Sequence, residues 1–98
     1  MEVILSPLQS GLMEQVTVYP NPFISKISLE ITSLDNKTAI VSLLNSQERI
    51  IKMFSWNVKA GMNKTSINGL GSLPAGTYRL VLKETNGTPL HDTKITKE

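Results

Sequence analysis

Cysteine is absent from this 98-residue sequence, and histidine occurs only once, at His91. A chain without cysteine can form neither a disulfide framework nor a thiolate metal site. Aromatic residues are also scarce, at 5% of the sequence, so few side chains remain for an exposed ligand platform once a core is built. These shortages exclude disulfide scaffolds and thiolate metal sites, but they leave the cellular compartment open.

Neither sign of charge dominates the sequence, which has ten Lys and Arg residues against eight Asp and Glu residues and a formal net charge of +2. The basic residues do not cluster, so we expect no nucleic-acid partner. No apolar run approaches the roughly 20 residues of a membrane-spanning helix. Residues 1–7 lack the basic start and the apolar core of a signal peptide, so an exported form would carry its targeting peptide on a longer precursor.

Catalytic arrangements are missing as well. His91 and Asp92 are neighbours, and on a strand they would point to opposite faces, so they cannot easily act as a base and its orienting carboxylate. The acidic residues show neither paired-carboxylate spacing nor a calcium-loop signature. Gly69-Leu70-Gly71 lacks the further glycines and the following helix of a phosphate-binding loop. We therefore expect a non-enzymatic domain with no cofactor, no metal ion and a surface histidine.

Short alternating segments are what the sequence does contain. Lys26 to Thr32 alternates polar and apolar residues with the period of a half-buried strand, while Thr38 to Leu44 is apolar on both faces and indicates a central strand. Turn residues separate such segments, and Asn86-Gly87 predicts a hairpin with a type I′ turn. Turns are also expected at 34–37, 60–63 and 73–76. The predicted strands are 15–19, 26–32, 38–44, 49–58, 64–68, 77–83 and 90–96.

This pattern predicts an all-β fold, an Ig-like β-sandwich of about seven antiparallel strands, because turn signals recur every 8 to 12 residues and no segment has helical periodicity. Trp56 shares strand parity with Phe54 and Val58, so we place it on a buried or half-covered face. The residues expected to be mainly buried are Ile27, Leu29, Ile31, Val41, Leu43, Tyr78, Leu80 and Leu82.

Five motifs, in order, give the sequence a family resemblance. Val18-Tyr19-Pro20-Asn21-Pro22-Phe23, followed by an alternating strand, resembles the opening motif of the C-terminal sorting domains of the type IX secretion system. The resemblance continues through 43–46 and 60–63, then 73–80, and closes with Lys94-Ile95-Thr96-Lys97. Two residues depart from the family pattern: Leu44 stands where members often have Tyr, and Glu48 where the following turn usually has Gly. The departures put the geometry of that turn in doubt.

The resemblance covers residues 15–98 and implies a C-terminal secretion signal, with residues 1–14 as a linker from an upstream passenger. Such a domain directs the passenger from the periplasm across the outer membrane, to the cell surface or into the medium. The implied partners are the type IX translocon, an outer-membrane shuttle and a sortase-like protein that cuts before about Gln15, so that the domain is removed or processed at the surface. We expect the isolated domain to be monomeric. Two alternatives stay open, an Ig-like carbohydrate-binding or adhesive module and a structural spacer domain.

Each motif also has a structural interpretation. The two prolines of the opening motif remove backbone donors, so this segment must end or edge a sheet. Phe23 is either a core residue or a recognition residue, and Tyr78 is expected as the corner tyrosine of an Ig-like fold. The candidate recognition residues are Tyr19, Pro20, Asn21, Pro22, Phe23, Gly61, Asn63, Pro74, Gly76, Tyr78, Lys94, Ile95 and Lys97.

The segment Lys94 to Glu98 is predicted to matter more for export than for folding. Four of its five residues are polar, and only Ile95 is expected to bury substantial apolar area. On this basis its removal costs about 1 to 3 kcal/mol. The alternative is a merely solvated strand end, because terminal residues often fray.

Overall fold

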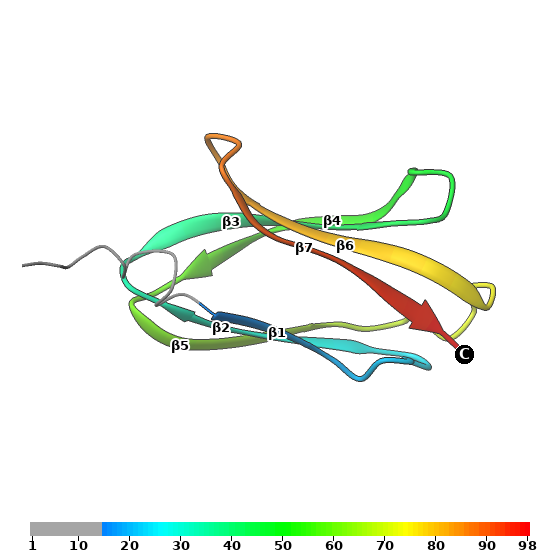
Figure 1. Ribbon diagram of the computed structural model, residues 1–98. Coiled ribbons are helices and arrows are strands. Elements are labelled where there is room, and N and C mark those ends of the chain that lie inside the picture. Colours follow the sequence, from blue (N-terminus) through cyan, green and yellow to red (C-terminus); the bar gives the residue numbers. More distant parts are fainter. Residues whose placement is uncertain (1–14) are drawn as a thin grey trace, which may run out of the picture.

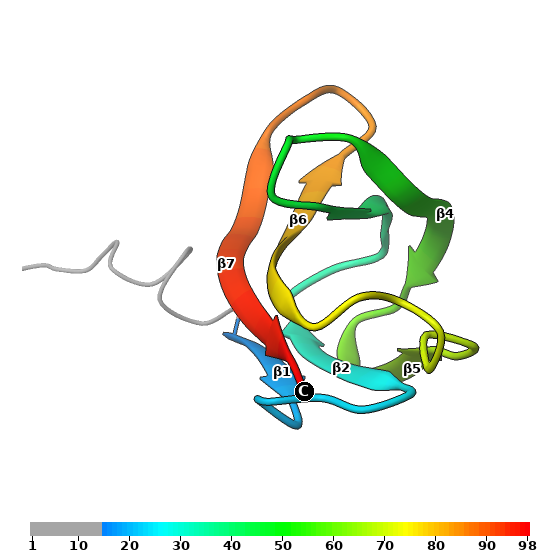
Figure 2. The ribbon, with the colours of Figure 1, turned by 90° about the vertical axis from the view of Figure 1, so that its right-hand side faces the viewer.

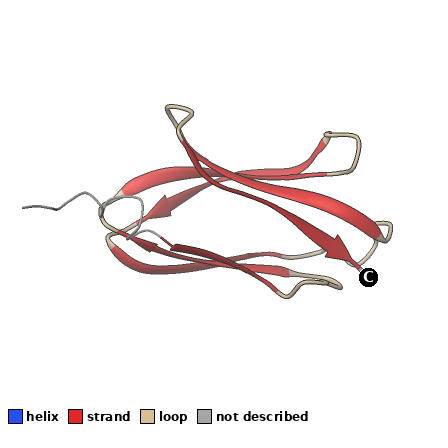
Figure 3. Cartoon of the chain, in the orientation of Figure 1, coloured by secondary structure: helices blue, strands red, loops and turns tan. Residues whose placement is uncertain are grey.

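The computed structural model describes residues 15–98, which form seven strands and no helix, and hence no helix that could cross a membrane (Figures 1 and 3). The strands are β1 (Gln15–Tyr19), β2 (Ile27–Ser33), β3 (Lys37–Leu44), β4 (Ile50–Val58), β5 (Gly61–Ile67), β6 (Gly76–Glu84) and β7 (Pro89–Lys97). The prediction of seven short strands is therefore confirmed. The proposed linker, residues 1–14, lies outside the described range.

The strands form two antiparallel sheets packed face to face, seen from the side in Figure 1 and nearly end-on in Figure 2. One sheet has the order β1-β2-β5, and the other has the order β4-β3-β6-β7. Apolar residues alternate along the strands, so each sheet turns one apolar face inward. The all-β sandwich predicted from the sequence is the fold observed.

The core contains every residue predicted for it. Phe54 and Trp56 are half-buried and pack against this core, and Val58 is buried. The buried apolar side chains that the prediction did not include are Ala39, Ile67, Leu70 and Val81. Ala39 and Val81 lie in runs of consecutive apolar residues, where alternation does not select the buried side, and Leu70 lies in a loop.

The chain reverses between β4 and β5 within fewer residues than expected. The sequence suggests a turn at 60–63 and a strand at 64–68, whereas β5 already begins at Gly61, which pairs with Ser33 of β2. Gly61 has a φ of 101°, a conformation that only glycine adopts easily. The turn therefore finishes at Gly61, and the rest of the expected turn becomes strand.

The hairpin between β6 and β7 is present, but its turn is not type I′. A type I′ turn needs positive φ at both central residues, and only Gly87, with a φ of 93°, meets this condition. The Gly87 N–H donates to the Glu84 carbonyl at 2.8 Å, and the Asn86 side chain accepts from the Thr88 N–H at 2.9 Å. The loop between the paired residues Glu84 and Thr88 therefore has three residues and ends on Gly87 in a left-handed conformation. Three-residue loops of this kind are common in hairpins.

Glu48, in the turn between β3 and β4, adopts the conformation that the expected glycine would have. It has a φ of 63°, and no other non-glycine residue within 15–98 has a positive φ. The Asn45 side chain fixes this turn by accepting from the N–H groups of Gln47 and Arg49 at 2.9 and 3.0 Å. The turn between β3 and β4 therefore has the left-handed backbone geometry expected for a glycine, and Glu48 adopts it in place of glycine.

Replacing Glu48 with glycine should therefore relieve backbone strain. We expect Glu48→Gly to have a free energy of unfolding about 1 kcal/mol above that of Glu48→Ala, because both lack the carboxylate and only alanine keeps a Cβ in the left-handed region. Urea unfolding of the two purified variants measures this difference. Equal stability, or a more stable alanine variant, would contradict the assignment of strain to this residue.

Candidate functional site

The opening motif and the end of the chain lie side by side at one end of the sandwich. The loop 20–26 between β1 and β2 runs beside the last residues of β7 in both views (Figures 1 and 2). The loop 68–75 between β5 and β6 lies at the same end, since the Leu70 N–H donates to the Ser25 carbonyl at 2.9 Å. We call this end, made of residues 20–26, 68–75 and 94–98, the C-terminal pole. β1 begins at the opposite end, where Gln15 pairs with Thr32 near the end of β2.

Three hydrogen bonds hold the opening motif to the last residues of the chain, and we call them the terminal clasp. The Phe23 N–H donates to the Thr96 carbonyl at 2.8 Å, and the Glu98 N–H donates to the Phe23 carbonyl at 3.0 Å. The Asn21 side-chain oxygen accepts from the Thr96 N–H at 3.0 Å. Phe23 thereby forms a parallel bridge with Lys97. Residues 21–23 thus lie along the end of β7 like a very short extra strand.

Two prolines flank Asn21 in this extra strand. Pro20 and Pro22, each preceded by a cis peptide bond, have no N–H to donate to a neighbouring strand. Phe23 makes the backbone bridge to β7, and the Asn21 side-chain oxygen accepts from the Thr96 N–H. The motif both ends β1 and supplies the clasp.

Phe23 anchors the pole in the core. Its side chain is fully buried and meets Tyr78 edge to face, with ring centroids 5.9 Å apart and ring planes at 66°. The Tyr78 hydroxyl donates to the Pro74 carbonyl at 2.6 Å, so this tyrosine holds the start of β6 against the preceding corner. Tyr78 is thus the expected corner tyrosine, and Phe23 is a core residue.

The end of β7 is more deeply buried than predicted. Ile95 and Lys97 both face inward, and Lys97 retains only 6% of its surface exposed, so the expectation that Ile95 alone buries area is wrong. The long methylene stem of lysine can pack on apolar surface while its ammonium stays at the edge. Here the Lys97 ammonium donates to the Glu98 carbonyl at 3.0 Å. Residues 94–98 therefore contribute to the folded structure, in addition to any role in export.

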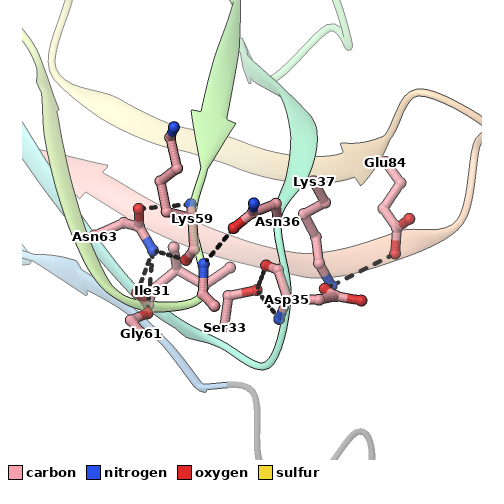
Figure 4. Close-up of polar contacts among 10 residues, drawn as sticks. Ile31, Ser33, Asp35, Asn36, Lys37, Lys59, Gly61, Asn63 and Glu84 are labelled. Carbon is pink, nitrogen blue, oxygen red and sulfur yellow. Dashed lines mark hydrogen bonds and ion pairs between the residues drawn. The ribbon is translucent and has the colours of Figure 1, made fainter.

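Gly61 and Asn63 belong to the other end of the domain, away from the clasp. Figure 4 shows the Asn63 side chain turned onto the backbone of the β4–β5 turn. Its oxygen accepts from the Lys59 N–H at 2.9 Å, and its nitrogen donates to the carbonyls of Lys59 and Gly61 at 2.8 and 3.1 Å. The Asn36 side chain accepts from the Ala60 N–H nearby at 2.9 Å. Asn63 therefore acts as a turn lock, which explains its place in the pattern.

Charged residues pair on the outer faces of both sheets. Arg79 on β6 makes two hydrogen bonds to the Asp92 carboxylate at 2.6 and 2.8 Å and one to Glu48 at 2.6 Å. These bonds raise the pKa of Arg79 and lower the pKa of Asp92. On the three-stranded sheet the Tyr19 hydroxyl donates to Glu30, and the pKa of Lys64 is raised, chiefly by its hydrogen bond with Tyr19. Tyr19 therefore belongs to the outer face rather than to the clasp.

Catalytic and metal-binding groups do not gather anywhere in the described range. Residues 15–98 contain no group of three or more His, Cys, Asp or Glu side chains that could hold a metal ion. Asp92 is exposed and paired with Arg79, whereas His91 is half-buried and pairs across the strands with Leu82. The two neighbours face opposite ways, as the strand alternation predicts.

One exposed apolar residue at the pole was missed by the sequence reasoning. Ile24 follows the opening motif directly and keeps 61% of its surface exposed. A lone apolar residue in a loop gives no periodic signal, and its neighbour Phe23 had taken the expected core position. Pro20, Asn21, Pro22 and Thr96 are also exposed, so the pole presents a mixed polar and apolar surface.

Comparison with known families gives one match. A family model described as the secretion system C-terminal sorting domain matches residues 17–97, a range that includes β1, the clasp and almost all of β7. No curated protein matches the chain.

Removing the Asn21 amide should loosen the clasp without unfolding the domain. We expect Asn21→Ala to lower the free energy of unfolding by about 1 kcal/mol, because the Thr96 N–H loses its acceptor. Amide hydrogen exchange at Thr96 should become faster. In Asn21→Asp the acceptor remains, and exchange at Thr96 should stay slow. An unchanged exchange rate at Thr96 in the alanine variant would contradict the clasp.

Deleting residues 94–98 should destabilise the domain severely. The deletion removes the burial of Ile95, worth about 1.5 to 3 kcal/mol, and three clasp bonds worth about 1 kcal/mol each. For a domain of this size we expect the Tm to fall by about 20 °C or more. Deleting Glu98 alone removes one clasp bond and should cost only a few degrees. Thermal unfolding of both proteins tests this, and a five-residue deletion with a normal Tm would contradict it.

Proposed function

Because this chain belongs to the secretion system C-terminal sorting domains, the C-terminal secretion signals of the type IX secretion system, we propose that its C-terminal pole is the surface which the secretion machinery reads. The family implies an amino-terminal passenger and export across the outer membrane. The proposal concerns which part of the domain carries the signal. It rests on one observation, the terminal clasp.

The clasp supports this proposal because it turns two distant sequence motifs into one surface of fixed geometry. Asn21 and Phe23 come from the opening motif, and Thr96 comes from the closing one. A receptor that binds at the pole meets parts of both motifs together. This accounts for the opening and closing motifs of the family pattern.

The direction of the chain supports the same proposal. β1 begins at the end of the sandwich opposite the pole (Figure 1), because Gln15 pairs with Thr32 near the end of β2. The five residues of β1 alone span about 17 Å at the usual rise of a strand. We propose that residues 1–14 form the linker to the passenger and residues 15–98 form the sorting domain. The reading surface then points away from the passenger and stays accessible whatever the passenger is.

The proposed partners are the type IX translocon, an outer-membrane shuttle and a sortase-like peptidase that cuts before about Gln15. The passenger would then be anchored at the cell surface or released. The domain itself is proposed to be non-catalytic, because Asp92 is occupied by Arg79 and turns away from His91. The opposing candidate, a carbohydrate-binding module, gains no support from the aromatic residues, since Phe23 and Tyr78 are buried and Phe54 and Trp56 pack against the core.

A pair of single substitutions tests the pole without disturbing the fold. Ile24 at the pole and Leu34 in the β2–β3 turn are both exposed aliphatic residues, with 61% and 51% of their surfaces exposed. We expect Ile24→Ser to reduce surface delivery of a passenger fused to residues 15–98 by about tenfold, because binding surfaces concentrate their energy in few residues. Leu34→Ser should leave delivery unchanged. Both variants should keep the parental Tm.

The measurement is the fraction of passenger delivered to the surface of a type IX-competent cell. An Ile24→Ser fusion delivered as well as the parent would contradict the pole as the reading surface. A parental fusion that stays in the periplasm would instead contradict residues 15–98 as a sufficient signal.

A further inference from the structure

The outer edge of β7 is an open strand edge that the clasp occupies only at its last residues. β7 is the edge strand of the four-stranded sheet, and β6 lies on its other side. The Thr96 N–H and C=O both bond to the 21–23 segment, so both point away from β6. Backbone groups two residues apart on a strand point the same way. The N–H and C=O groups of Lys94 and Asp92 therefore face the same open edge.

These groups have almost no partner within residues 15–98. No strand of the described range lies on this side of β7, apart from the single-residue bridge at Phe23. The Lys94 carbonyl has only a long contact, 3.4 Å, with the Thr93 hydroxyl. β1, which precedes Asn21, does not supply the missing strand, because it pairs with β2 and forms no ladder with β7. An exposed edge of this kind readily accepts a further strand.

Beside the open edge lies a small hollow between β1 and β7. Its volume is about 90 Å³, enough for one small side chain, given the ≈ 30 Å³ that a liquid water occupies. Its lining is mainly polar and comes from Asn21, His91, Thr93 and Lys94, with Val18 and Ile95 beside them. Side chains alternate along an added strand, so one of them would reach this hollow when its backbone pairs with the edge.

The charge at this edge is positive. The Asp92 carboxylate is taken up by Arg79 on the outer face of the sheet, with bonds of 2.6 and 2.8 Å. Lys94 is exposed and has no carboxylate within salt-bridge distance in residues 15–98. An incoming segment with an acidic side chain opposite Lys94 would complement this charge.

From these features we propose that the β7 edge at Asp92–Lys94 accepts an extended, acidic segment of an outer-membrane secretion protein, which adds as a strand beside the clasp. A small polar side chain of that segment fills the hollow between β1 and β7. Main-chain hydrogen bonds provide the affinity, as in other strand-addition complexes. This inference rests on the proposed sorting function and names how the pole is bound.

Substitution of Lys94 separates the backbone edge from the side chain. Lys94→Pro removes the outward N–H, which β6 does not use, and proline is tolerated at such positions of edge strands. We expect it to reduce surface delivery of the fused passenger by about tenfold or more, since strand addition depends on main-chain bonds. Lys94→Gln keeps the N–H and should reduce delivery by only about threefold or less. Lys94→Glu keeps the N–H but repels an acidic segment, and it should reduce delivery as strongly as proline.

The Tm of each purified variant is measured alongside. If Lys94→Pro lowers the Tm, the comparison of Lys94→Glu with Lys94→Gln decides, because both substitutions are on an exposed side chain. Delivery of the glutamate and proline variants at the parental level overturns the strand-addition site while the sorting function stands. A parental fusion that is not delivered contradicts the sorting function itself. Sedimentation of the isolated domain as a dimer that Lys94→Pro dissociates would assign the edge to a second copy and overturn the proposal.

Discussion

The terminal clasp is the constraint on which the C-terminal pole depends. Its hydrogen bond from Thr96 to Asn21 spans 75 residues of sequence, almost the whole described chain. Around it, Phe23 enters the core and meets Tyr78, and Tyr78 in turn fixes the corner before β6. Without the clasp, β7 would lose the only backbone bridge on its outer edge within residues 15–98, and the loop 20–26 would lose its hydrogen bonds to the four-stranded sheet. Folding of the domain and formation of the pole are therefore coupled.

This coupling changes how the closing motif should be interpreted. A polar sequence at a chain end suggests a solvated tag, yet Ile95 and Lys97 face the core and pair with β6. These two residues complete the sandwich, while the exposed residues between and beside them, Lys94, Thr96 and Glu98, form part of the pole surface. A secretion system that binds such a pole would accept folded domains and ignore those whose last strand is not in place.

The sequence predicted the fold well because burial in a sandwich repeats every two residues. Ile27, Leu29 and Ile31 are buried for the reason that their alternation suggests. The clasp could not be predicted in this way, since one side-chain amide that bonds a distant backbone leaves no periodic trace. The same holds for the turn lock at Asn63 and for the Asn86 turn, where side chains replace backbone partners. The burial of Lys97 escaped prediction because a charged residue was read as exposed, although its stem packs inward.

The placement of the two ends of the domain has a mechanical consequence. β1 starts at the end opposite the pole and runs toward it, paired with β2 through five residues. If the pole is held while the passenger pulls on Gln15, the load acts along the strand axis. The β1–β2 hydrogen bonds then share that load and must shear together, whereas a pull across the strands would break them one after another. Under such a pull, β1 would stay in the sandwich until these bonds break together.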